Sequence, residues 1–288
     1  MRICLMLEGQ EGISWEQWVA LAHAAEAADL DGLFRSDHYR SIVRGDPAGS
    51  LEAWATLAGL AAVTTRIRLG TMVSPVTFRH GSVLAKLATT VDHISGGRVE
   101  LGVGAGWFEA EHAAYGFPFG TASSRLDELD RQLEEITRQW TVADDVWPKP
   151  LQQPRPPIIV GGSAKPRTVR AAVAHADEYN TVWPSLEEAR ERRRIVDDAA
   201  RAADRAPLRF SMMTSCVVAH DEADLADRLG AFKALTGDMP AIHGTVEQVA
   251  ERLRAYEQAG VERAMLQHLA HEDVEMVAVL GEVAAHLR

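Results

Sequence analysis

The sequence contains little cysteine, since only Cys4 and Cys216 occur among its 288 residues. Two thiols far apart in the chain cannot form the disulfide framework of a small secreted protein, and no CxxC pair offers a metal site. Long apolar runs are missing as well. The opening MRICLMLEGQ holds an apolar run of about six residues, which is shorter than the core of a signal peptide. No stretch approaches the roughly 20 apolar residues that span a bilayer, so we expect a cytoplasmic protein that does not enter the membrane.

The chain also has fewer basic than acidic residues. Lys and Arg number 30 against 41 Asp and Glu, which gives a formal net charge of −11. Nucleic acids and anionic membranes attract basic surfaces, so neither is expected as the main partner. A local basic pocket for an anionic ligand stays compatible with this balance. Hydrophobic residues make up 47% and charged residues 25% of the chain, which is typical of a soluble globular protein.

The sequence does contain a repeating pattern, in which a short apolar run is followed by an amphipathic stretch. The runs are rich in Val, Ile and Leu and are bounded by Gly or Pro, as expected of strands that are buried on both faces. Eight strands are predicted, at residues 2–7, 32–36, 66–73, 98–103, 157–161, 178–182, 209–219 and 262–267.

Helical patterns lie between the predicted strands. Ser14 and Gln17 form a capping box ahead of an apolar helix face, and apolar residues at three- and four-residue spacing predict a helix near 122–140. Parallel strands joined by helices need both sheet faces covered, and eight such units close naturally into a barrel of roughly 250 residues. We therefore predict a single α/β domain over 1–288, a parallel (β/α)8 TIM barrel. A doubly wound sheet of six to eight strands is the alternative.

The active site of such a barrel lies at the carboxyl ends of its strands, so the residues that follow each strand are informative. These residues are Glu8, Asp37, His38, Ser74, Gly104, Gly106, Gly162, Ser163, Trp183, Gln267 and His268. His38 could donate to a ring carbonyl or deliver a proton, because an imidazole titrates near neutrality. Asp37 could orient that imidazole or bind a polar ligand edge. A loop-capping Asp next to a surface His explains the pair equally well.

Glycines at strand ends suggest places where the backbone approaches a ligand. The stretch Gly70–Pro75 could form a bulge against a flat ligand, although an ordinary strand end stopped by proline is the simpler explanation. Gly102, Gly104 and Gly106 resemble a dinucleotide-binding fingerprint but lack its final spacing and its acidic residue. They would still allow a ligand tail to come close to the backbone.

A phosphate site is predicted after the fifth strand. Gly161, Gly162 and Ser163 lead into a helix that begins near 165, and such a turn presents free backbone N–H groups and the positive end of the helix dipole. Arg167 in the first turn could add a charged contact. A turn that needs glycine only for its backbone geometry, without binding a phosphate, explains these residues equally well. No metal-binding spacing, nucleophile elbow or Walker loop occurs, so the residues alone indicate a planar-ligand site and a phosphate site without naming a reaction.

At these same positions the sequence resembles the bacterial luciferase-like monooxygenase superfamily, in particular its F420-dependent oxidoreductase branch. The resemblance covers nearly the whole chain, and its longest ordered stretch spans residues 64–119. Shorter stretches are GLFRSDHY at 32–39, PPIIVGGS at 156–163 and GTVEQVAERLRAYEQAGVERAMLQHL at 244–269. A match of this length and order is far more specific than any one of the motifs above.

The resemblance implies roles for individual residues. Asp37 and His38 would lie beside the deazaflavin ring, with His38 as the candidate donor or acid and Glu8 as the next candidate. Met72 and Val73 fall where the family has a non-proline cis peptide bond that supports the ring from behind. With Ser74 from the strand-end pattern and Arg167 from the helix start, the full predicted cofactor-binding set is Asp37, His38, Met72, Val73, Ser74, Gly104, Ala105, Gly106, Gly161, Gly162, Ser163 and Arg167.

Within that set, residues 104–106 would approach the ribityl chain and residues 161–163 would hold the cofactor phosphate, which matches the independent prediction for that turn. Two positions depart from the family pattern. Trp107 stands where members that oxidise a sugar phosphate carry a catalytic glutamate, so that substrate is not expected here. Gly81 stands where relatives usually have a proline, which puts no role in doubt.

The activity that the resemblance implies is hydride transfer between F420 and an unsaturated or carbonyl-type small organic substrate, with the protein supplying orientation and a proton donor. FMN is the alternative cofactor, for a luciferase-like monooxygenase or a reductase. A non-catalytic barrel that binds a flavin or another planar ligand is an alternative of a different class, and an unrelated phosphate-binding barrel enzyme is a third. No metal is expected. Relatives are commonly homodimers, and the exposed faces of the helices near 52–62 and 80–95 are the expected interface.

Overall fold

Short buried strands and the helices between them account for most of the chain in this computed structural model, which describes residues 1–45 and 48–288. The strands are β1 (Arg2–Leu7), β2 (Gly32–Arg35), β3 (Arg68–Thr71), β4 (Ser74–Pro75), β5 (Val99–Gly104), β6 (Ile158–Gly162), β7 (Glu178–Val182), β8 (Arg209–Ala219), β9 (Ile242–Thr245) and β10 (Arg263–His268). The helices are α1 (Trp15–Ala27), α2 (Ala53–Val63), α3 (Gly81–Ser95), α4 (Glu109–Tyr115), α5 (Ala122–Thr141), α6 (Pro166–His175), α7 (Leu186–Ala202), α8 (Glu222–Thr236), α9 (Val246–Gln258), α10 (Glu275–His286) and the 3-10 turn η1 (Gly9–Glu11).

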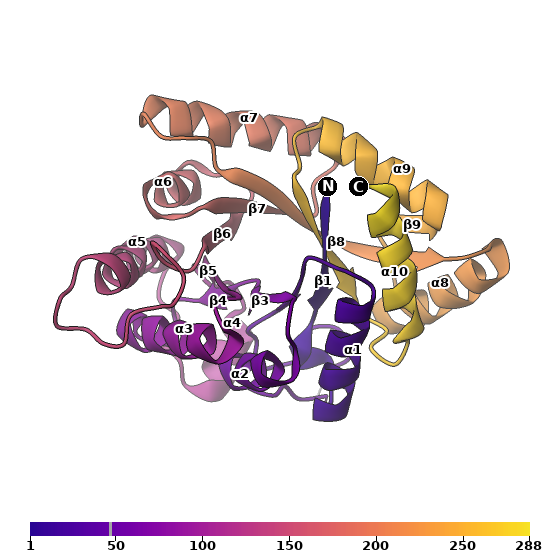
Figure 1. The fold of residues 1–288 in the computed structure, drawn as a ribbon, viewed down its shortest axis with the longest axis horizontal. Coiled ribbons are helices and arrows are strands. Elements are labelled where there is room, and N and C mark those ends of the chain that lie inside the picture. Colours follow the sequence, from indigo (N-terminus) through magenta and orange to yellow (C-terminus); the bar gives the residue numbers. More distant parts are fainter. Residues whose placement is uncertain (46–47) are drawn as a thin grey trace.

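Eight of the strands form a closed parallel barrel. Neighbours in the sheet follow the order β10–β1–β2–β3–β5–β6–β7–β8, and β8 pairs with β10 to close the ring. The helices surround this ring (Figure 1). The predicted (β/α)8 TIM barrel is therefore confirmed, because a doubly wound sheet would leave two open edges. At the amino end, the Met1 ammonium donates to the Leu287 carbonyl at 3.3 Å, so the two chain ends meet. Within the described residues, no helix has the length and apolar character needed to cross a membrane.

Two short strands lie outside the ring of eight. β4 pairs with β5, and β9 pairs with the second half of β8, from Cys216 to Ala219, while the first half of β8 pairs with β7 and β10. The predicted strand at 66–73 is shorter in the structure, because β3 ends at Thr71 and pairing resumes at Ser74. β9 was not predicted, since its sequence IHGT contains no apolar run.

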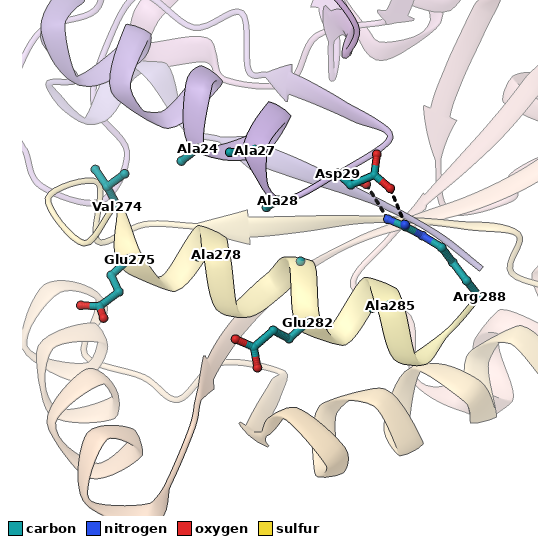
Figure 2. A pocket seen from close by; sticks show the side chains of 11 residues that line it. Ala24, Ala27, Ala28, Asp29, Val274, Glu275, Ala278, Glu282, Ala285 and Arg288 are labelled. Carbon is teal, nitrogen blue, oxygen red and sulfur yellow. Dashed lines mark hydrogen bonds and ion pairs between the residues drawn. The ribbon is translucent and has the colours of Figure 1, made fainter.

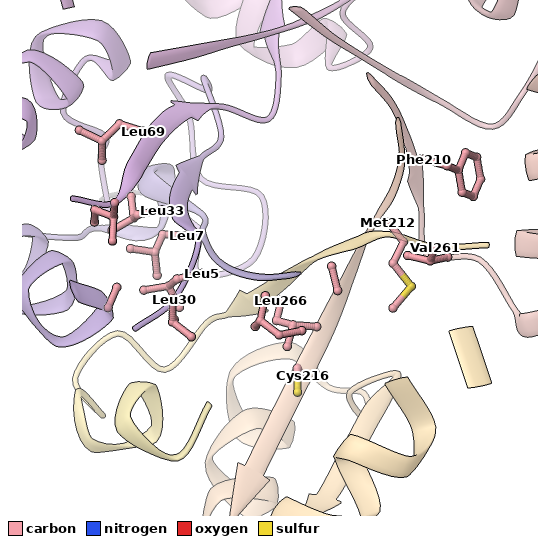
Figure 3. Packing of buried hydrophobic residues seen from close by; sticks show 14 of the residues in the cluster. Leu5, Leu7, Leu30, Leu33, Leu69, Phe210, Met212, Cys216, Val261 and Leu266 are labelled. Atoms are coloured by element: carbon pink, nitrogen blue, oxygen red, sulfur yellow. The ribbon is translucent and has the colours of Figure 1, made fainter. Parts of the chain in front are cut away.

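The main apolar core lies between the barrel and its helices. Alternating strand residues such as Leu5, Leu33 and Leu266 point outward into this layer, where they are buried (Figure 3). Their strand neighbours point inward. Met6 and Phe34 belong to a second, smaller cluster in which the other members are Cys4, Met72, Ile159, Met213 and Met265. The period-two alternation of strands thus produces two apolar layers from one set of segments.

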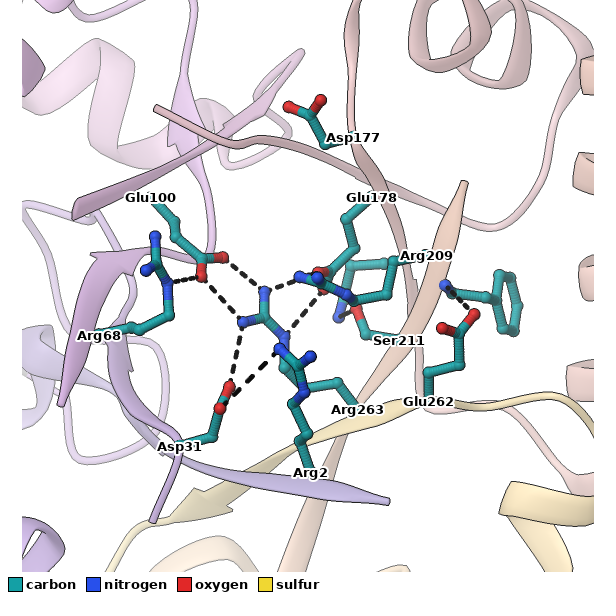
Figure 4. A network of polar contacts seen from close by, with 12 residues as sticks. Arg2, Asp31, Arg68, Glu100, Asp177, Glu178, Arg209, Ser211, Glu262 and Arg263 are labelled. Carbon is teal, nitrogen blue, oxygen red and sulfur yellow. Dashed lines mark hydrogen bonds and ion pairs between the residues drawn. The ribbon is translucent and has the colours of Figure 1, made fainter. Parts of the chain in front are cut away.

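A buried ionic cluster fills the amino end of the barrel interior (Figure 4). Arg263 is fully buried and forms ion pairs of 2.6 Å with both Glu100 and Glu178, with Asp31 at 3.4 Å. Burial alone would raise the pKa of Glu100, but Arg263 and Arg68 lower it to about 2. Burial raises the pKa of Glu178 above its ordinary value. Arg263 is therefore the shared counter-charge of Glu100 and Glu178, which have almost no contact with water, and Arg68 and Arg209 each pair with one of them.

Candidate active site

His38 lies beyond the carboxyl end of β2, and α4 brings Glu111 beside it. The imidazole Nδ1 is 2.7 Å from Glu111 Oε1, and the Tyr39 backbone N–H donates to Glu111 Oε2 at 3.0 Å. Glu111 is 1% exposed, so the carboxylate is fixed by its surroundings. A carboxylate that accepts from Nδ1–H sets the tautomer and leaves Nε2 as the working nitrogen. No hydrogen bond to Nε2 comes from residues 1–45 or 48–288.

The charge state of His38 is set by its neighbours. Burial lowers its pKa, but the hydrogen bond and the negative charge of Glu111 act more strongly together, and the net pKa is raised above that of free histidine. The charge of Glu8 acts in the same direction. The rings of Trp107 and Phe108 lie edge-on to the imidazole, with centroids at 5.8 and 6.2 Å. His38 therefore remains a proton donor at higher pH than an ordinary histidine.

Asp37 has a different environment from His38, although the two are adjacent in sequence. Its side chain is buried, and Arg79 binds both carboxylate oxygens, at 2.7 and 3.1 Å. Ser74 Oγ donates to Asp37 at 2.6 Å, and the indole N–H of Trp54 donates to Ser74 Oγ at 3.0 Å. Both predicted polar residues, Asp37 and Ser74, are thus paired with protein groups between the barrel and α2.

Glu8 accepts hydrogen bonds from two side-chain amides. Gln10 Nε2 donates to one carboxylate oxygen at 2.9 Å, and Gln267 Nε2 donates to the other. Gln267 Oε1 in turn accepts the indole N–H of Trp183 at 2.9 Å. The structure therefore joins Glu8, Gln267 and Trp183, three of the predicted strand-end residues, in one hydrogen-bonded chain across β1, β10 and β7.

The peptide bond between Met72 and Val73 is cis, at the position that the resemblance implied. The glycines opposite this bond leave room for the side chain of Val73. A Cβ added to Gly104 would lie 2.5 Å from Val73 Cγ2, and one added to Gly161 would lie 3.3 Å from Val73 Cγ1. The space beside Gly104 and Gly161 is therefore filled by Val73. The approach of a ligand tail to residues 104–106 stays a prediction. Between them in sequence, the half-buried Ala105 leads to Gly106, whose φ of +81° requires glycine.

The turn at 161–163 leads into the N-terminus of α6, as predicted. Lys165 is the N-cap residue but provides no side-chain cap, so the first backbone N–H groups of the helix are left free of a cap. Tyr179 supports the turn from behind, because its hydroxyl accepts the Ala164 N–H at 2.8 Å and lies 2.7 Å from where a Cβ on Gly162 would be placed. Ser163 is exposed. Free N–H donors at a helix N-terminus match the chemistry of a phosphate.

Two predicted contributors lie elsewhere. The guanidinium of Arg167 points to α5, where it pairs with Asp127 and donates to Ser123, so it is engaged away from the turn. His268 is fully enclosed, and its Nε2 is 2.9 Å from the Asp273 carbonyl oxygen. Burial lowers the pKa of His268 to about 4, which keeps it neutral at physiological pH.

Other features of the molecule do not add to this site. A groove of about 640 Å³ lies outside the barrel between α1 and α10, among small side chains, with the Asp29–Arg288 ion pair beside it (Figure 2). None of the predicted site residues lines this groove. Among residues 1–45 and 48–288, no cluster of three His, Cys, Asp or Glu side chains is arranged to hold a metal ion.

Comparison with known families places the chain in one of them. The family model of luciferase-like monooxygenases matches residues 3–239. The chain belongs to the luciferase-like monooxygenase family. An uncharacterized protein of Mycobacterium tuberculosis is 30% identical over 220 residues, which cover 72% of this chain and 74% of that protein.

Solved structures of luciferase-like enzymes share the fold. An F420-dependent secondary alcohol dehydrogenase, in complex with an F420–acetone adduct, superimposes with a TM-score of 0.82 at 18% identity, over 100% of this chain and 99% of the other. The oxygenating constituent of 3,6-diketocamphane monooxygenase from Pseudomonas putida, in complex with FMN, gives 0.77 at 16% identity, over 99% and 98%. The predicted enzyme class, a luciferase-like oxidoreductase or monooxygenase, is confirmed at that level, and both cofactor types occur among the structural neighbours.

Sequence reasoning did not identify Glu111 or Arg79, the charged partners of His38 and Asp37. Glu111 lies on α4, a short helix within a loop that carried no strong periodic pattern. The family-like stretch 64–119 contains both residues but assigned a role to neither. Gly116, whose left-handed conformation ends the helix, marks the end of α4.

Proposed function

We propose that this luciferase-like protein is an F420-dependent oxidoreductase that transfers a hydride between the cofactor and a small organic carbonyl or unsaturated compound. The observation that carries the proposal is the His38–Glu111 pair at the carboxyl end of the barrel. A bound deazaflavin supplies the hydride chemistry, and the protein has to supply orientation and a proton. His38 is placed to do the second, because Glu111 holds its Nδ1 and stabilises its charged form.

The other residues of the site have supporting roles in this proposal. The uncapped N-terminus of α6 and the 161–163 turn hold the cofactor phosphate through backbone N–H groups. The cis peptide at Met72–Val73, seated on Gly104 and Gly161, forms the surface behind the ring. Trp107 and Phe108 shield the imidazole on one side from water. Residues 161–163 suit any flavin-type phosphate, so an FMN-dependent monooxygenase or reductase is the second candidate, supported by the FMN-bound structural neighbour.

A turnover assay without oxygen separates the F420-dependent oxidoreductase from the FMN-dependent monooxygenase. We expect the purified protein to oxidise reduced F420 when enones, imines or ketones are added under anaerobic conditions, because a carbonyl or alkene accepts the hydride and His38 supplies the proton. The reaction is followed by the return of the absorbance of the oxidised deazaflavin. Turnover that requires both FMN and oxygen would instead assign the chain to the monooxygenases, and a barrel that binds a flavin without turnover would assign it to the non-catalytic class.

We further propose that two chains pair through α2 and α3. The sequence of α2, AWATLAGLAAV, contains no charged residue, and Val63 at its end is 40% exposed. On α3, Val83 and Ile94 are 51% and 45% exposed. Exposed apolar side chains that gather on neighbouring helices are commonly covered by a partner. We expect light scattering to give the mass of a dimer, and the double variant Val83→Glu, Ile94→Lys to give a monomer.

The matched control for this prediction is Met239→Glu, which changes an exposed apolar residue on another part of the surface. It should leave the dimer intact. A wild-type chain that remains monomeric at all working concentrations would contradict the proposed interface.

A further inference from the structure

Trp183 is a large apolar side chain in an exposed position at the carboxyl end of the barrel. It follows β7 directly, and 61% of the residue is exposed. Isolated exposed apolar residues are common on protein surfaces and need no explanation by themselves. Trp183 differs from them in its backbone conformation and in how firmly it is held.

The backbone of Trp183 has a φ of +42°, in the left-handed region. Among the described residues, three other non-glycine residues have positive φ, and two of these, Asp29 and Asp204, directly follow the C-cap residues of α1 and α7. That place is where left-handed residues commonly end helices. Trp183 instead precedes Pro184, which favours extended conformations in the residue before it. Backbone outliers of this kind persist only where the surroundings enforce them, and they concentrate at functional sites.

The surroundings of Trp183 do enforce this conformation. Its backbone N–H donates to the Met213 carbonyl at 2.8 Å. The next residue, Pro184, is buried, and its carbonyl accepts the Tyr256 hydroxyl at 2.9 Å. Ser185 then caps α7 with a capping box. The chain is therefore fixed on both sides of the exposed indole.

The indole ring itself is fixed by the hydrogen-bonded chain that ends on Glu8. The Trp183 N–H donates to Gln267 Oε1, and Glu8 accepts from the amide nitrogen of Gln267. Glu8 therefore fixes which end of the Gln267 amide faces Trp183. The charge of Glu8 also contributes to the raised pKa of His38, so Glu8 acts on the candidate acid as well as on the amide that holds the indole. A rigid indole with its polar edge satisfied presents its apolar face to a ligand at little cost in conformational entropy.

We propose that Trp183 is a specificity-determining residue that contacts the organic substrate through its ring face, and that Glu8 and Gln267 are positioning residues for it. This inference rests on the proposed function, since it names the class of substrate for the same site. The substrate is a flat, unsaturated or aromatic ring compound. The flat ring of the cofactor could also stack on the indole, and the experiment distinguishes a contact with the substrate from a contact with the cofactor.

Binding of two probe ketones tests the proposal without turnover. Benzylideneacetone carries an aromatic ring, and 3-nonen-2-one is an aliphatic enone of similar size. We expect the wild-type protein loaded with F420 to bind benzylideneacetone more tightly in a calorimetric titration. Trp183→Ala should weaken that binding by about fivefold to tenfold, the scale of one aromatic contact, and should change 3-nonen-2-one binding much less. Trp183→Phe should keep most of the ring preference. Trp147→Ala, which removes an exposed tryptophan on the segment between α5 and β6, is the matched control.

The positioning role has a spectroscopic test. Gln267→Leu removes the acceptor for the Trp183 indole N–H, so the NMR resonance of that proton, assigned with Trp183→Phe, should move to the position of a solvent-exposed indole. The ring preference should fall in the same variant. An unmoved resonance would contradict the role of Gln267.

Other outcomes overturn the main inference. The first is that the wild-type protein shows no preference for the aromatic ketone, and the second is that this preference survives Trp183→Ala. The third is that Trp183→Ala loses as much affinity for F420 as for benzylideneacetone, because the indole would then contact the cofactor. Failure of the proposed function gives a different result. The protein would bind neither F420 nor FMN, while its cofactor-free form would still bind benzylideneacetone more tightly than 3-nonen-2-one.

Discussion

His38→Ala is expected to lower turnover by roughly 10²–10⁴-fold, the usual contribution of a general acid or base. The imidazole is the group held by the buried Glu111, and its Nε2 is the atom left to serve a substrate. Cofactor affinity should fall much less, because the 161–163 turn and the N-terminus of α6 are unchanged. Steady-state rates and cofactor titrations of the same preparations separate the two effects.

The conservative variant His38→Gln separates polarisation from proton transfer, since it keeps a hydrogen-bond donor but cannot deliver a proton. Turnover of the Gln variant near the wild-type level would mean that polarisation is sufficient. Turnover of the Ala variant near that level would remove His38 from the mechanism, and Glu8 would become the next candidate.

The pH dependence of turnover follows from the same pair. The pKa of His38 is raised by Glu111, so the protonated donor persists at higher pH than in free histidine and is lost as the pH rises through the raised value. Glu111→Gln removes the negative charge and keeps an acceptor. The alkaline limb of the profile should then move to lower pH, because burial, which lowers the pKa of His38, is no longer outweighed. If the alkaline limb of the Glu111→Gln profile stays at the wild-type pH, a group other than His38 controls it.

Arg263→Met is expected to destabilise the fold by roughly 3–5 kcal/mol, the usual effect of removing one partner of a buried ion pair. Arg263 is completely buried, and its removal leaves Glu100 and Glu178 with only the partly exposed Arg68 and Arg209 as counter-charges. The deficit should shrink in acid, because protonated carboxyl groups need no cation. The midpoint of denaturant unfolding, measured at neutral and acidic pH, gives both quantities.

An exposed ion pair provides the control for Arg263. Arg170 is 66% exposed in its side chain and pairs with Asp130 at 3.0 Å, so Arg170→Ala should cost about 1 kcal/mol or less. Equal effects of the two substitutions would contradict the view that the cluster at the amino end of the barrel depends on burial.

The strands of the barrel could be predicted because they are buried on both faces and therefore appear as apolar runs. β9 could not, since it pairs with an extension of β8 and carries His243 and Gly244 where an apolar run would be expected. The ionic cluster was also missed. Glu100, Glu178 and Arg263 lie near the starts of their strands, where charge in a sequence resembles the surface, and only ring closure brings them together.

The candidate site was predicted in part for a similar reason. The topology of a barrel brings strand-end residues to one end, so sequence position alone predicts that His38 and the 161–163 turn lie at that end. The direction of each side chain was not encoded in that position. Asp37 turns toward Arg79 and Arg167 turns toward Asp127, because each finds an opposite charge on a neighbouring segment. Glu111 lies far from His38 in sequence, and only the fold of the loop that contains α4 places them in contact.

The most direct measurement of the central proposal is a fluorescence titration of the cofactor-free protein with F420 and, in parallel, with FMN. The proposed function predicts a dissociation constant for F420 in the micromolar range or tighter, and much weaker binding of FMN. Equal affinities for the two cofactors, or tighter binding of FMN, would contradict the F420 assignment while leaving the barrel fold unaffected.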